Sequence, residues 1–409
     1  MANKKYSLFE VTGIELEYMV VDKSSLKVTP VVDQLFHNRV GSYVSDIECG
    51  DIDWSNELVA HVVELKTAQP VKSLNGLSQL FHQQVTDINK RLAPLQAQLM
   101  PTAVHPLMDP DSETQLWQHE YNEIYALYNR IFDCRGHGWS NLQSMHINLP
   151  FANDEEFGKL HAAIRVLLPI IPALSASSPI LDGQYTGYKD TRMHAYLQNQ
   201  LRIPILTGAL VPEKVFDKAS YHKQIFEPII EAIKPFDTEG VTDHHFLNSR
   251  GAIARFDRGA IEIRVIDLQE CPAADIAIAA LIVESLKVMV EETWSNVIVQ
   301  QSWDEQRLKE LFLKVIKEGE NAIIRDEAFL ALFGIKAMAL KASAIWMHLY
   351  DKVGSRLAPE MQEVLEHIFT KGSLATRISK AVGMQPDEAR IKEVFNELAT
   401  CLSENRIFG

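Results

Sequence analysis

The sequence predicts an α+β fold built on a mostly antiparallel β-sheet. Short strand-like runs are mixed with helices up to about residue 270, and beyond that point the periodicity is almost entirely helical. The strand-like runs are not each followed by a crossover helix of regular length, as a parallel sheet would require. We therefore expect a sheet region over residues 1–272 and a helical region over residues 273–409, packed together as one domain.

The first strand-like run, TGIELEYMVVD at residues 12–22, has one apolar and one acidic face. Side chains alternate along a strand, so Glu15 and Glu17 point away from Ile14, Leu16 and Tyr18. Carboxylates gathered on one face repel each other unless a cation neutralises them. We therefore expect a positive partner above this face.

Three later runs repeat this pattern of an apolar face opposite an ionisable one. HVVELKTAQP carries Glu64, SMHINLP carries His146 and Asn148, and GAIEIRVID carries Glu262 and Arg264. Any one run reads equally well as a half-exposed strand, but solvent faces favour Lys, Thr, Ser and Gln over these residue types. Together the four runs predict a single site on one face of the sheet.

The helical part begins at ECPAAD, residues 270–275. The stretch that starts at Ala273, AADIAIAALIVESLKVMVEETW, is apolar on most of its circumference, which predicts a buried helix under the sheet. DEQRLKELFLKVIKEG and PDEARIKEVFNELATCL are amphipathic helices with acidic starts, as the helix dipole favours.

The composition excludes several classes of protein. The chain has 409 residues, 46% of them hydrophobic, which suffices for a large core, and its net charge of −14 disfavours a basic nucleic-acid surface. The four cysteines are scattered without a CxxC pair, and no run of about 18 uncharged apolar residues occurs. We expect a soluble cytoplasmic protein with free thiols, no nucleic-acid partner and no membrane segment.

Several carboxylates with one imidazole suit a hard divalent cation, Mg²⁺ or Mn²⁺, better than Zn²⁺. Mg²⁺ commonly binds through a few carboxylates together with substrate phosphates. The chain has neither GxxxxGK[ST] nor GxGxxG, so a nucleotide would be held in another way. The pattern indicates phosphoryl transfer, with Arg264 available to stabilise charge on the transferring group.

Six segments resemble, in order, the signatures of glutamate-cysteine ligase family 2, the bacterial carboxylate-amine ligases. They are GIELEYMVVD, ELVAHVVELKT, AVHPL, SMHINLP, PALSASSPI and RGAIEIRVID. GIELE alone is only moderately specific, whereas the ordered set is strongly so. The resemblance implies a glutamine-synthetase-like fold, in which a curved, mainly antiparallel sheet forms a funnel and helices cover its outer face. It also implies that ATP phosphorylates a carboxylate and that an amine then attacks the acyl phosphate.

The resemblance assigns roles to the residues at the matching positions. It implies that two or three Mg²⁺ ions, or Mn²⁺ in their place, bridge the ATP phosphates. The implied metal ligands are Glu15, Glu17, Glu64, His146 and Glu262. Arg264 would stabilise the transferring phosphoryl group, so that Glu262 and Arg264 form the expected catalytic pair.

Five further residues are candidates for binding substrate or nucleotide. Glu57 is a further metal ligand, an amine-site carboxylate or an exposed strand-end residue. Arg192 lies in a segment rich in Gly and Tyr, which is typical of a substrate loop. Arg250 and Arg255 flank GAIA before the last signature strand; the spacing leaves the choice open, and we favour Arg250. Asn148 is expected to reach substrate from the HxN strand.

The function expected from these residues is an ATP-dependent ligase that joins a carboxylate to an amine, with glutamate and cysteine as the expected pair. Two alternatives stay open: a phosphotransferase that stops at a phosphorylated small molecule, and a nucleotide or amino-acid sensor without turnover. The intact set of Glu and His positions argues against the sensor. The oligomeric state also stays open: the family analogues and the helical C-terminal part are compatible with a homo-oligomer, but the amphipathic faces of that part are equally compatible with completing the core. The pair His244–His245 is interpreted as structural or solvated.

Overall fold

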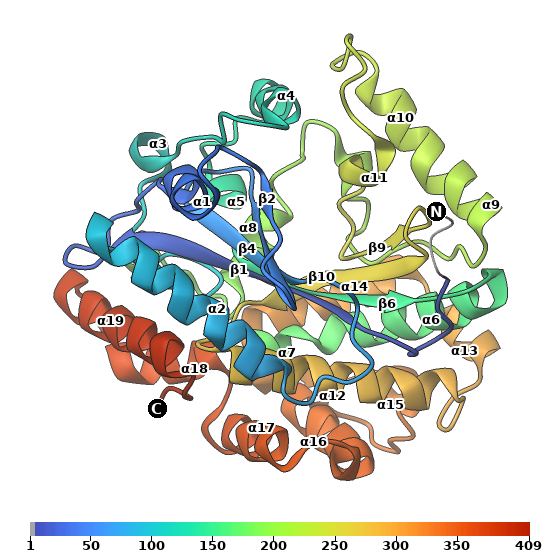
Figure 1. Cartoon of the computed structure of the whole chain (residues 1–409). Helices are drawn as coiled ribbons and strands as arrows, with labels where there is room; N and C mark the ends of the chain where they lie inside the picture. The colour runs from blue at the N-terminus through green and yellow to red at the C-terminus, as the bar shows by residue number, and fades with distance from the viewer. Residues whose placement is uncertain (1–4) are drawn as a thin grey trace.

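A computed structural model describes residues 5–409, so the first four residues of the expected sheet region lie outside it (Figure 1). Its centre is an eight-stranded sheet in the order β2-β3-β4-β1-β6-β10-β9, with β5 also paired to β1. Every neighbouring pair in this sheet is antiparallel. The predicted α+β fold with a mainly antiparallel sheet is therefore confirmed.

The strands of this sheet are short and rich in Val, Ile and Leu. They are β1 (Gly13–Asp22), β2 (Asp46–Ile47), β3 (Ile52–Asn56), β4 (Val62–Thr67), β5 (Ala97–Met100), β6 (Ser144–Pro150), β9 (Ala252–Arg255) and β10 (Ala260–Asp267). In residues 5–409, two small two-stranded sheets lie outside it: β7 (Ile180–Leu181) with β8 (Gln184–Tyr185), and β11 (Ile323–Ile324) with β12 (Leu340–Lys341).

The apolar face of the sheet is covered by long helices. Ile14 and Leu16 of β1, with Ile147 of β6, are fully buried in one core with Leu281 and Leu286 of α12. In Figure 1 these helices lie below the sheet. They include α2 (Leu77–Leu92), α12 (Pro272–Val290), α16 (Ala342–Val353), α17 (Pro359–Lys371), α18 (Leu374–Val382) and α19 (Glu388–Glu404). The layer is completed by α6 (Asp154–Leu167), α7 (Pro172–Ser175), α13 (Val297–Ser302), α14 (Glu305–Glu318) and α15 (Glu327–Ala331).

The helix α12 lies where the sequence predicts a buried helix. Its buried residues run along almost its whole length, and it contacts α2, α6, α16 and α17. A helix that is apolar all round must be enclosed on every side, and the C-terminal helices complete that enclosure. Among residues 5–409, no helix combines the length and apolarity needed to cross a membrane. All four cysteines are free thiols.

Shorter elements rise above the polar face of the sheet. In Figure 1, α4 and α10 with α11 stand on that side of the sheet. These elements are α3 (Pro110–Glu113), α4 (Asn122–Phe132), α5 (His137–Ser140), α8 (Thr191–Tyr196), α9 (Lys218–Tyr221), α10 (Glu227–Ile233) and α11 (His244–Leu247). The helix α1 (Val32–Val40) instead packs against α2, to which the ion pair of Arg39 with Asp87 joins it.

Candidate active site

The strand register gathers the ionisable faces of the four predicted runs at the middle of the sheet. Glu15 of β1 lies opposite His146 of β6, and Glu17 lies opposite Glu64 of β4. Glu262 of β10 is separated from β1 only by β6, whose Asn148 is its partner. Because side chains alternate, all of these carboxylates point to the same face as His146.

Gly13 allows this close packing of β1 against β6. A Cβ atom at Gly13 would lie 3.1 Å from the Cβ of Asn148, which is its partner in the register. Real Cβ contacts are rarely so tight, so glycine keeps β6 close enough for the amide of Asn148 to donate to Glu15 Oε1 at 3.0 Å. Asn148 does not line the cavity described below, and it acts instead as a support for Glu15.

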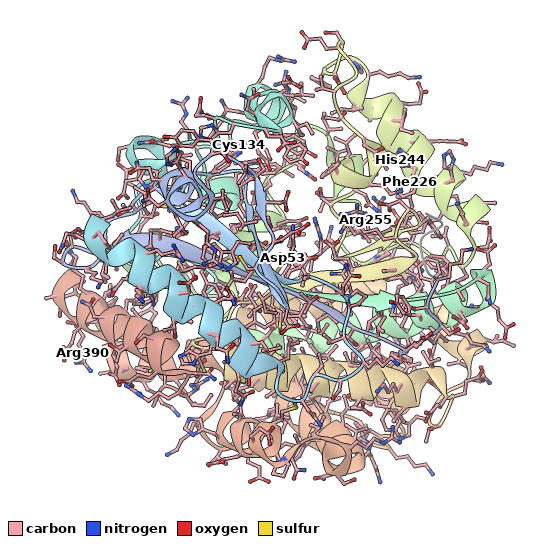
Figure 2. All side chains as sticks on the ribbon, in the orientation of Figure 1. Asp53, Cys134, Phe226, His244, Arg255 and Arg390 are labelled. Carbon is pink, nitrogen blue, oxygen red and sulfur yellow. The ribbon has the colours of Figure 1, made fainter. Side chains whose placement is uncertain are left out.

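Above this face lies a cavity of about 440 Å³. Its floor is acidic and comes from the sheet, with Glu15, Glu17, Glu57, Glu64, His146 and Glu262. Arg192, Arg255, Arg258 and Arg264 form its basic wall, and aromatic residues complete the lining. The side-chain view of Figure 2 shows Arg255 beside this opening. A cavity with an acidic floor and a basic wall suits cations bound together with an anionic substrate.

His146 is the centre of the hydrogen-bonded part of the floor. Its Nδ1 lies 3.0 Å from Glu15 Oε2, and its Nε2 lies 2.9 Å from Ser144 Oγ and 3.7 Å from Glu17 Oε1. Burial opposes a charge on the ring, but the contacts with Glu15 and Glu17 outweigh it and raise the pKa of His146. The carboxylates of Glu15 and Glu17 thus favour the protonated ring, whose charge offsets part of theirs.

Glu57 and Glu64 form the less neutralised part of the floor. Burial, with the charges of Glu17 and Glu64, raises the pKa of Glu57 well above its ordinary value. Burial and Glu15 raise the pKa of Glu64 to about 7, although Lys66 and a hydrogen bond from Ser55 Oγ at 2.6 Å oppose the rise. Too little positive charge thus lies near these carboxylates to neutralise them, and a bound divalent cation would supply it.

Two groups of ligand atoms on this floor have metal-site spacing. One group is Glu15, Glu64 and His146, and the other is Glu17, Glu57 and Glu64; within each group the ligand atoms lie within 4.8 Å of one another. Glu64 belongs to both, so it is placed to bridge two neighbouring ions. The oxygen-rich donor set fits Mg²⁺ or Mn²⁺ better than Zn²⁺.

The raised pKa of Glu64 predicts how stability depends on pH and Mg²⁺. Between its ordinary pKa of 4.5 and about 7, the folded metal-free protein binds more protons than the unfolded chain, so its stability falls as pH rises through this interval. Mg²⁺ needs the ionised carboxylate and should therefore raise the melting temperature more at about pH 7.5 than at about pH 5.5. Thermal unfolding with and without Mg²⁺ measures this, and an equal Mg²⁺ shift in wild type and Glu64→Gln at both pH values would contradict it.

Glu262 lies between two arginines at the other end of the floor. Arg264 Nε donates to Glu262 Oε1 at 2.6 Å, and Arg255 Nη1 lies 3.8 Å from Glu262 Oε2. Burial opposes the charge on Glu262, but Arg264 and His146 overcome it and lower the pKa of Glu262 to about 2. The same ion pair raises the pKa of Arg264, despite burial. Glu262 is thus a permanent anion that orients Arg264 at the cavity wall.

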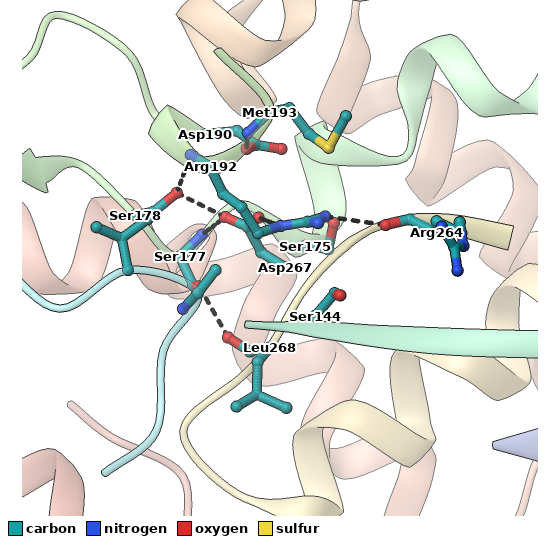
Figure 3. A network of polar contacts seen from close by, with 12 residues as sticks. Ser144, Ser175, Ser177, Ser178, Asp190, Arg192, Met193, Arg264, Asp267 and Leu268 are labelled. Atoms are coloured by element: carbon teal, nitrogen blue, oxygen red, sulfur yellow. Dashed lines mark hydrogen bonds and ion pairs between the residues drawn. The ribbon is translucent and has the colours of Figure 1, made fainter. Parts of the chain in front are cut away.

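Arg192 is held rigidly at the edge of the cavity by a buried network (Figure 3). Its Nε donates to Asp267 Oδ1 at 2.6 Å, and its Nη2 donates to the backbone oxygen of Arg264 at 3.2 Å. Asp267 Oδ2 in turn accepts from Ser177 N and Ser178 Oγ. Arg192 itself lies in the first turn of the short helix α8, directly after the Gly- and Tyr-rich segment, and only 3% of the residue is exposed.

Asp190 is the second carboxylate of this network. Its Oδ1 accepts from Met193 N and so caps α8, while its buried Oδ2 has no hydrogen-bond partner. Burial and the neighbouring Asp267 raise the pKa of Asp190 well above its ordinary value, against the effect of Arg192. Burial thus favours the neutral form of Asp190, whereas Asp267 is the carboxylate that pairs directly with Arg192 at 2.6 Å.

The structure places Arg255, and not Arg250, at the cavity. Arg250 is fully buried away from it, and its Nε and Nη2 each donate to one oxygen of Glu213 at 2.6 Å. The preference for Arg250 as a substrate ligand is therefore corrected. The sequence cannot separate the two arginines, because the partner that engages Arg250 is 37 residues away in the chain.

The aromatic wall is the part of the cavity that the sequence interpretation did not identify. Tyr121, Ile124, Tyr125 and Tyr128 line the cavity from one side of α4, and Trp139, Tyr196 and Phe246 extend the wall. A signal was present in the run YNEIYALY, where apolar residues recur with helical spacing and so predict one apolar face. The face was not assigned to the site because nothing in the sequence tells which element it covers.

Comparisons with known proteins agree with this geometry. Residues 11–319 match the family described as glutamate-cysteine ligase family 2. An uncharacterised protein of Archaeoglobus fulgidus is 33% identical over 289 residues, which are 71% of this chain and 77% of that protein. A protein of Nocardioides sp., provisionally named glutamate–cysteine ligase 2-1, is 23% identical and is matched over 73% of this chain and 72% of its own length.

Two solved structures share the fold. The glutamate–cysteine ligase of Francisella tularensis in complex with AMP has a TM-score of 0.61 and 14% identity, with 98% of this chain and 90% of that chain covered. A bifunctional glutathione synthetase of Pasteurella multocida has a TM-score of 0.62 and 13% identity, and the match covers 97% of this chain and 53% of that chain. At such low identity these structures show a common fold.

Proposed function

Because this chain belongs to glutamate-cysteine ligase family 2, an ATP-dependent carbon–nitrogen ligase family, we propose that it joins the γ-carboxylate of glutamate to the amine of cysteine through an acyl phosphate. The chain is thus an ATP-dependent carboxylate-amine ligase, and the two named substrates are the finer part of the proposal. The observation that carries it is the cavity in which an acidic floor, able to hold cations, faces a wall of four arginines.

The residues present fit the divalent ions that this chemistry requires. We place one Mg²⁺ among Glu15, Glu64 and His146 and a second among Glu17, Glu57 and Glu64, where the ligand atoms are within 4.8 Å. His146 would release its proton on binding, since only the neutral ring is a ligand. The bound ions would neutralise the phosphates of ATP and orient its γ-phosphoryl group. This spacing favours Glu57 as a metal ligand over an amine-site carboxylate.

The first chemical step transfers a phosphoryl group within the cavity. A carboxylate oxygen of the substrate forms a bond to the γ-phosphorus of ATP, and the bond from that phosphorus to the bridging oxygen of ADP breaks. Arg264 is fixed by Glu262 at 2.6 Å and presents its remaining N–H groups to the cavity, where the charge of the transferring group develops. Because Arg264 is already oriented, little reorganisation is needed during the step.

The second step forms the amide bond. The amine nitrogen attacks the acyl carbon, the bond from this carbon to the phosphate oxygen breaks, and inorganic phosphate leaves while the amine loses one proton. Arg192, fixed by Asp267, supplies a second preorganised cation for the carboxylates of the acidic substrate. The aromatic side chains of Tyr125, Tyr128 and Trp139 line the cavity and would reduce the contact of the acyl phosphate with water, which would otherwise hydrolyse it.

The test is release of phosphate from ATP and Mg²⁺ by the purified protein. The assay contains glutamate alone, or glutamate with cysteine or another amine, and the products are identified by mass. We expect phosphate release that depends on the amine, together with the mass of a γ-glutamyl amide. Amide formation with another acid or amine would change the substrate assignment but support the ligase reaction. A phosphorylated product without free phosphate would establish the phosphotransferase. ATP binding without turnover in any assay would favour the sensor.

A further inference from the structure

A second, smaller cavity lies behind one wall of the active-site cavity. Its volume is about 230 Å³, and three histidines line it: His222, His244 and His245. The helix α11 separates the two cavities, since it contributes His244 and His245 to the small one and Phe246 to the large one. In Figure 2, His244 and Phe226 are close together on the same side of the molecule as Arg255.

The turn between β9 and β10 is the other element that the cavities share. Arg255 and Arg258 line the active-site cavity, whereas Phe256 and Asp257 line the small one. Asp257 Oδ2 accepts from Arg255 Nη2 at 3.1 Å, which joins the two sets of residues. The histidine cluster is thus separate from the carboxylate floor, but it adjoins residues that enclose the active site.

The donor atoms of the small cavity have the spacing of a metal site. One ligand atom each from Asp243, His244 and His245 lie within 4.8 Å of one another. His245 Nε2 lies 3.6 Å from Asp257 Oδ1, and two ligands of a tetrahedral ion at about 2.1 Å from it are about 3.4 Å apart. The ring centroid of His222 lies 6.1 Å from that of His244.

The surroundings of His245 also resemble those of a metal-bound histidine. Its Nδ1 lies 2.7 Å from Asp243 Oδ1, and a carboxylate at one ring nitrogen is the usual arrangement that orients the other nitrogen toward an ion. The Phe226 ring packs against His244 at 4.5 Å and against His245 at 5.2 Å, between centroids, and so provides an apolar base. His245 keeps 16% of its side chain exposed, which leaves a path for an ion.

The chemistry of these donors differs from that of the active-site floor. Imidazoles with one or two carboxylates favour borderline ions such as Zn²⁺, whereas an oxygen-rich floor favours Mg²⁺. An anion would be repelled by the carboxylates of Asp243 and Asp257, despite Lys218 in the lining. The cluster therefore suits a divalent transition-metal ion.

We propose that His244 and His245, with the carboxylate of Asp257, bind one divalent transition-metal ion of the Zn²⁺ class at a site distinct from the Mg²⁺ floor, and that Asp243 orients the ring of His245. His222 stands at the open side of this site. The bound ion links α11 to the turn between β9 and β10, and it thereby holds two elements of the active-site wall together.

The test is the number of Zn²⁺ ions that the full-length protein binds by equilibrium dialysis with Mg²⁺ in excess. The variant His244→Gln/His245→Gln is expected to bind one equivalent fewer than wild type. Zn²⁺ is expected to raise the melting temperature of wild type more than that of the variant, because the ion stabilises only the state that holds it. The control His37→Gln/His82→Gln removes two histidines elsewhere and should bind as many ions as wild type.

A second variant keeps the test independent of the packing of the two rings. Asp257→Asn retains both histidines and is expected to weaken the binding of the same equivalent roughly tenfold. Equal Zn²⁺ stoichiometry in wild type and His244→Gln/His245→Gln would overturn the proposal, as would loss of the same equivalent in His37→Gln/His82→Gln. Neither readout requires ligase activity, so the proposal stands or fails separately from the proposed function.

Discussion

Replacing Glu262 by glutamine is expected to lower the Mg²⁺-dependent turnover of ATP by about 10²–10³-fold. Glu262 is 2% exposed, and its carboxylate pairs with Arg264 at 2.6 Å and with Arg255 at 3.8 Å. The amide has the same shape but no charge, so both guanidiniums lose the anion that orients them. Steady-state phosphate release, with the affinity for ATP measured separately, tests this expectation.

The matched control for this variant is Glu155→Gln. Glu155 is an exposed glutamate of α6 that pairs with Lys159 at the surface, so the same change of side chain there should leave turnover unchanged. A change in the Glu262 variant that is confined to ATP affinity would place Glu262 in nucleotide binding and not in the transfer step. Wild-type turnover in Glu262→Gln would contradict the assignment of the catalytic pair.

The second large effect is expected at Asp267, the anion that holds Arg192. Asp267→Asn leaves a guanidinium that is buried without its charged partner, which should lower the free energy of unfolding by about 3 kcal/mol. The Michaelis constant for the acidic substrate should also rise, because Arg192 loses its fixed orientation at the cavity. Urea unfolding and substrate titration measure the two effects.

Asp190→Asn is the matched comparison, because Asp190 is a buried carboxyl beside the same arginine. Its raised pKa favours the neutral acid, so we expect an amide of the same shape to cost about 1 kcal/mol or less. In Asp267→Asn, however, Asp190 can ionise and take over part of the pairing with Arg192. The double variant should therefore lose more stability than the two single variants together. An equal loss in the free energy of unfolding for Asp190→Asn and Asp267→Asn would show that the charge is not located on Asp267.

The sequence predicts the polar face of the sheet because a strand has a period of two. Glu15 and Glu17 alternate with buried residues, so both carboxylates lie on the polar face of the strand. This holds regardless of which strands pair with it. The same argument applies to Glu64, His146 and Glu262, and the predicted antiparallel sheet is confirmed. The buried helix α12 was predictable for a similar reason, since its lack of a polar face is visible in the sequence alone.

The residues that reach the cavity from outside these strands could not be predicted in this way. Arg250 and Arg255 are five positions apart, but Glu213 binds the first and Glu262 attracts the second. The apolar side of α4 faces the cavity only because the fold brings it above the sheet. Such pairings depend on contacts between distant segments, which no local periodicity encodes.

The sequence by itself therefore determined which faces of the strands carry charge, the family of the chain and the burial of α12, because strand and helix periodicity and ordered motifs are local properties. Only the tertiary structure decided the strand register that brings Glu64 between two groups of ligands, the choice of Arg255 over Arg250 and the position of the His244–His245 pair beside Asp257. All three features depend on contacts between segments that are distant in the chain. A charged side chain that is buried there must be paired with an opposite charge, and only the fold determines which one is near.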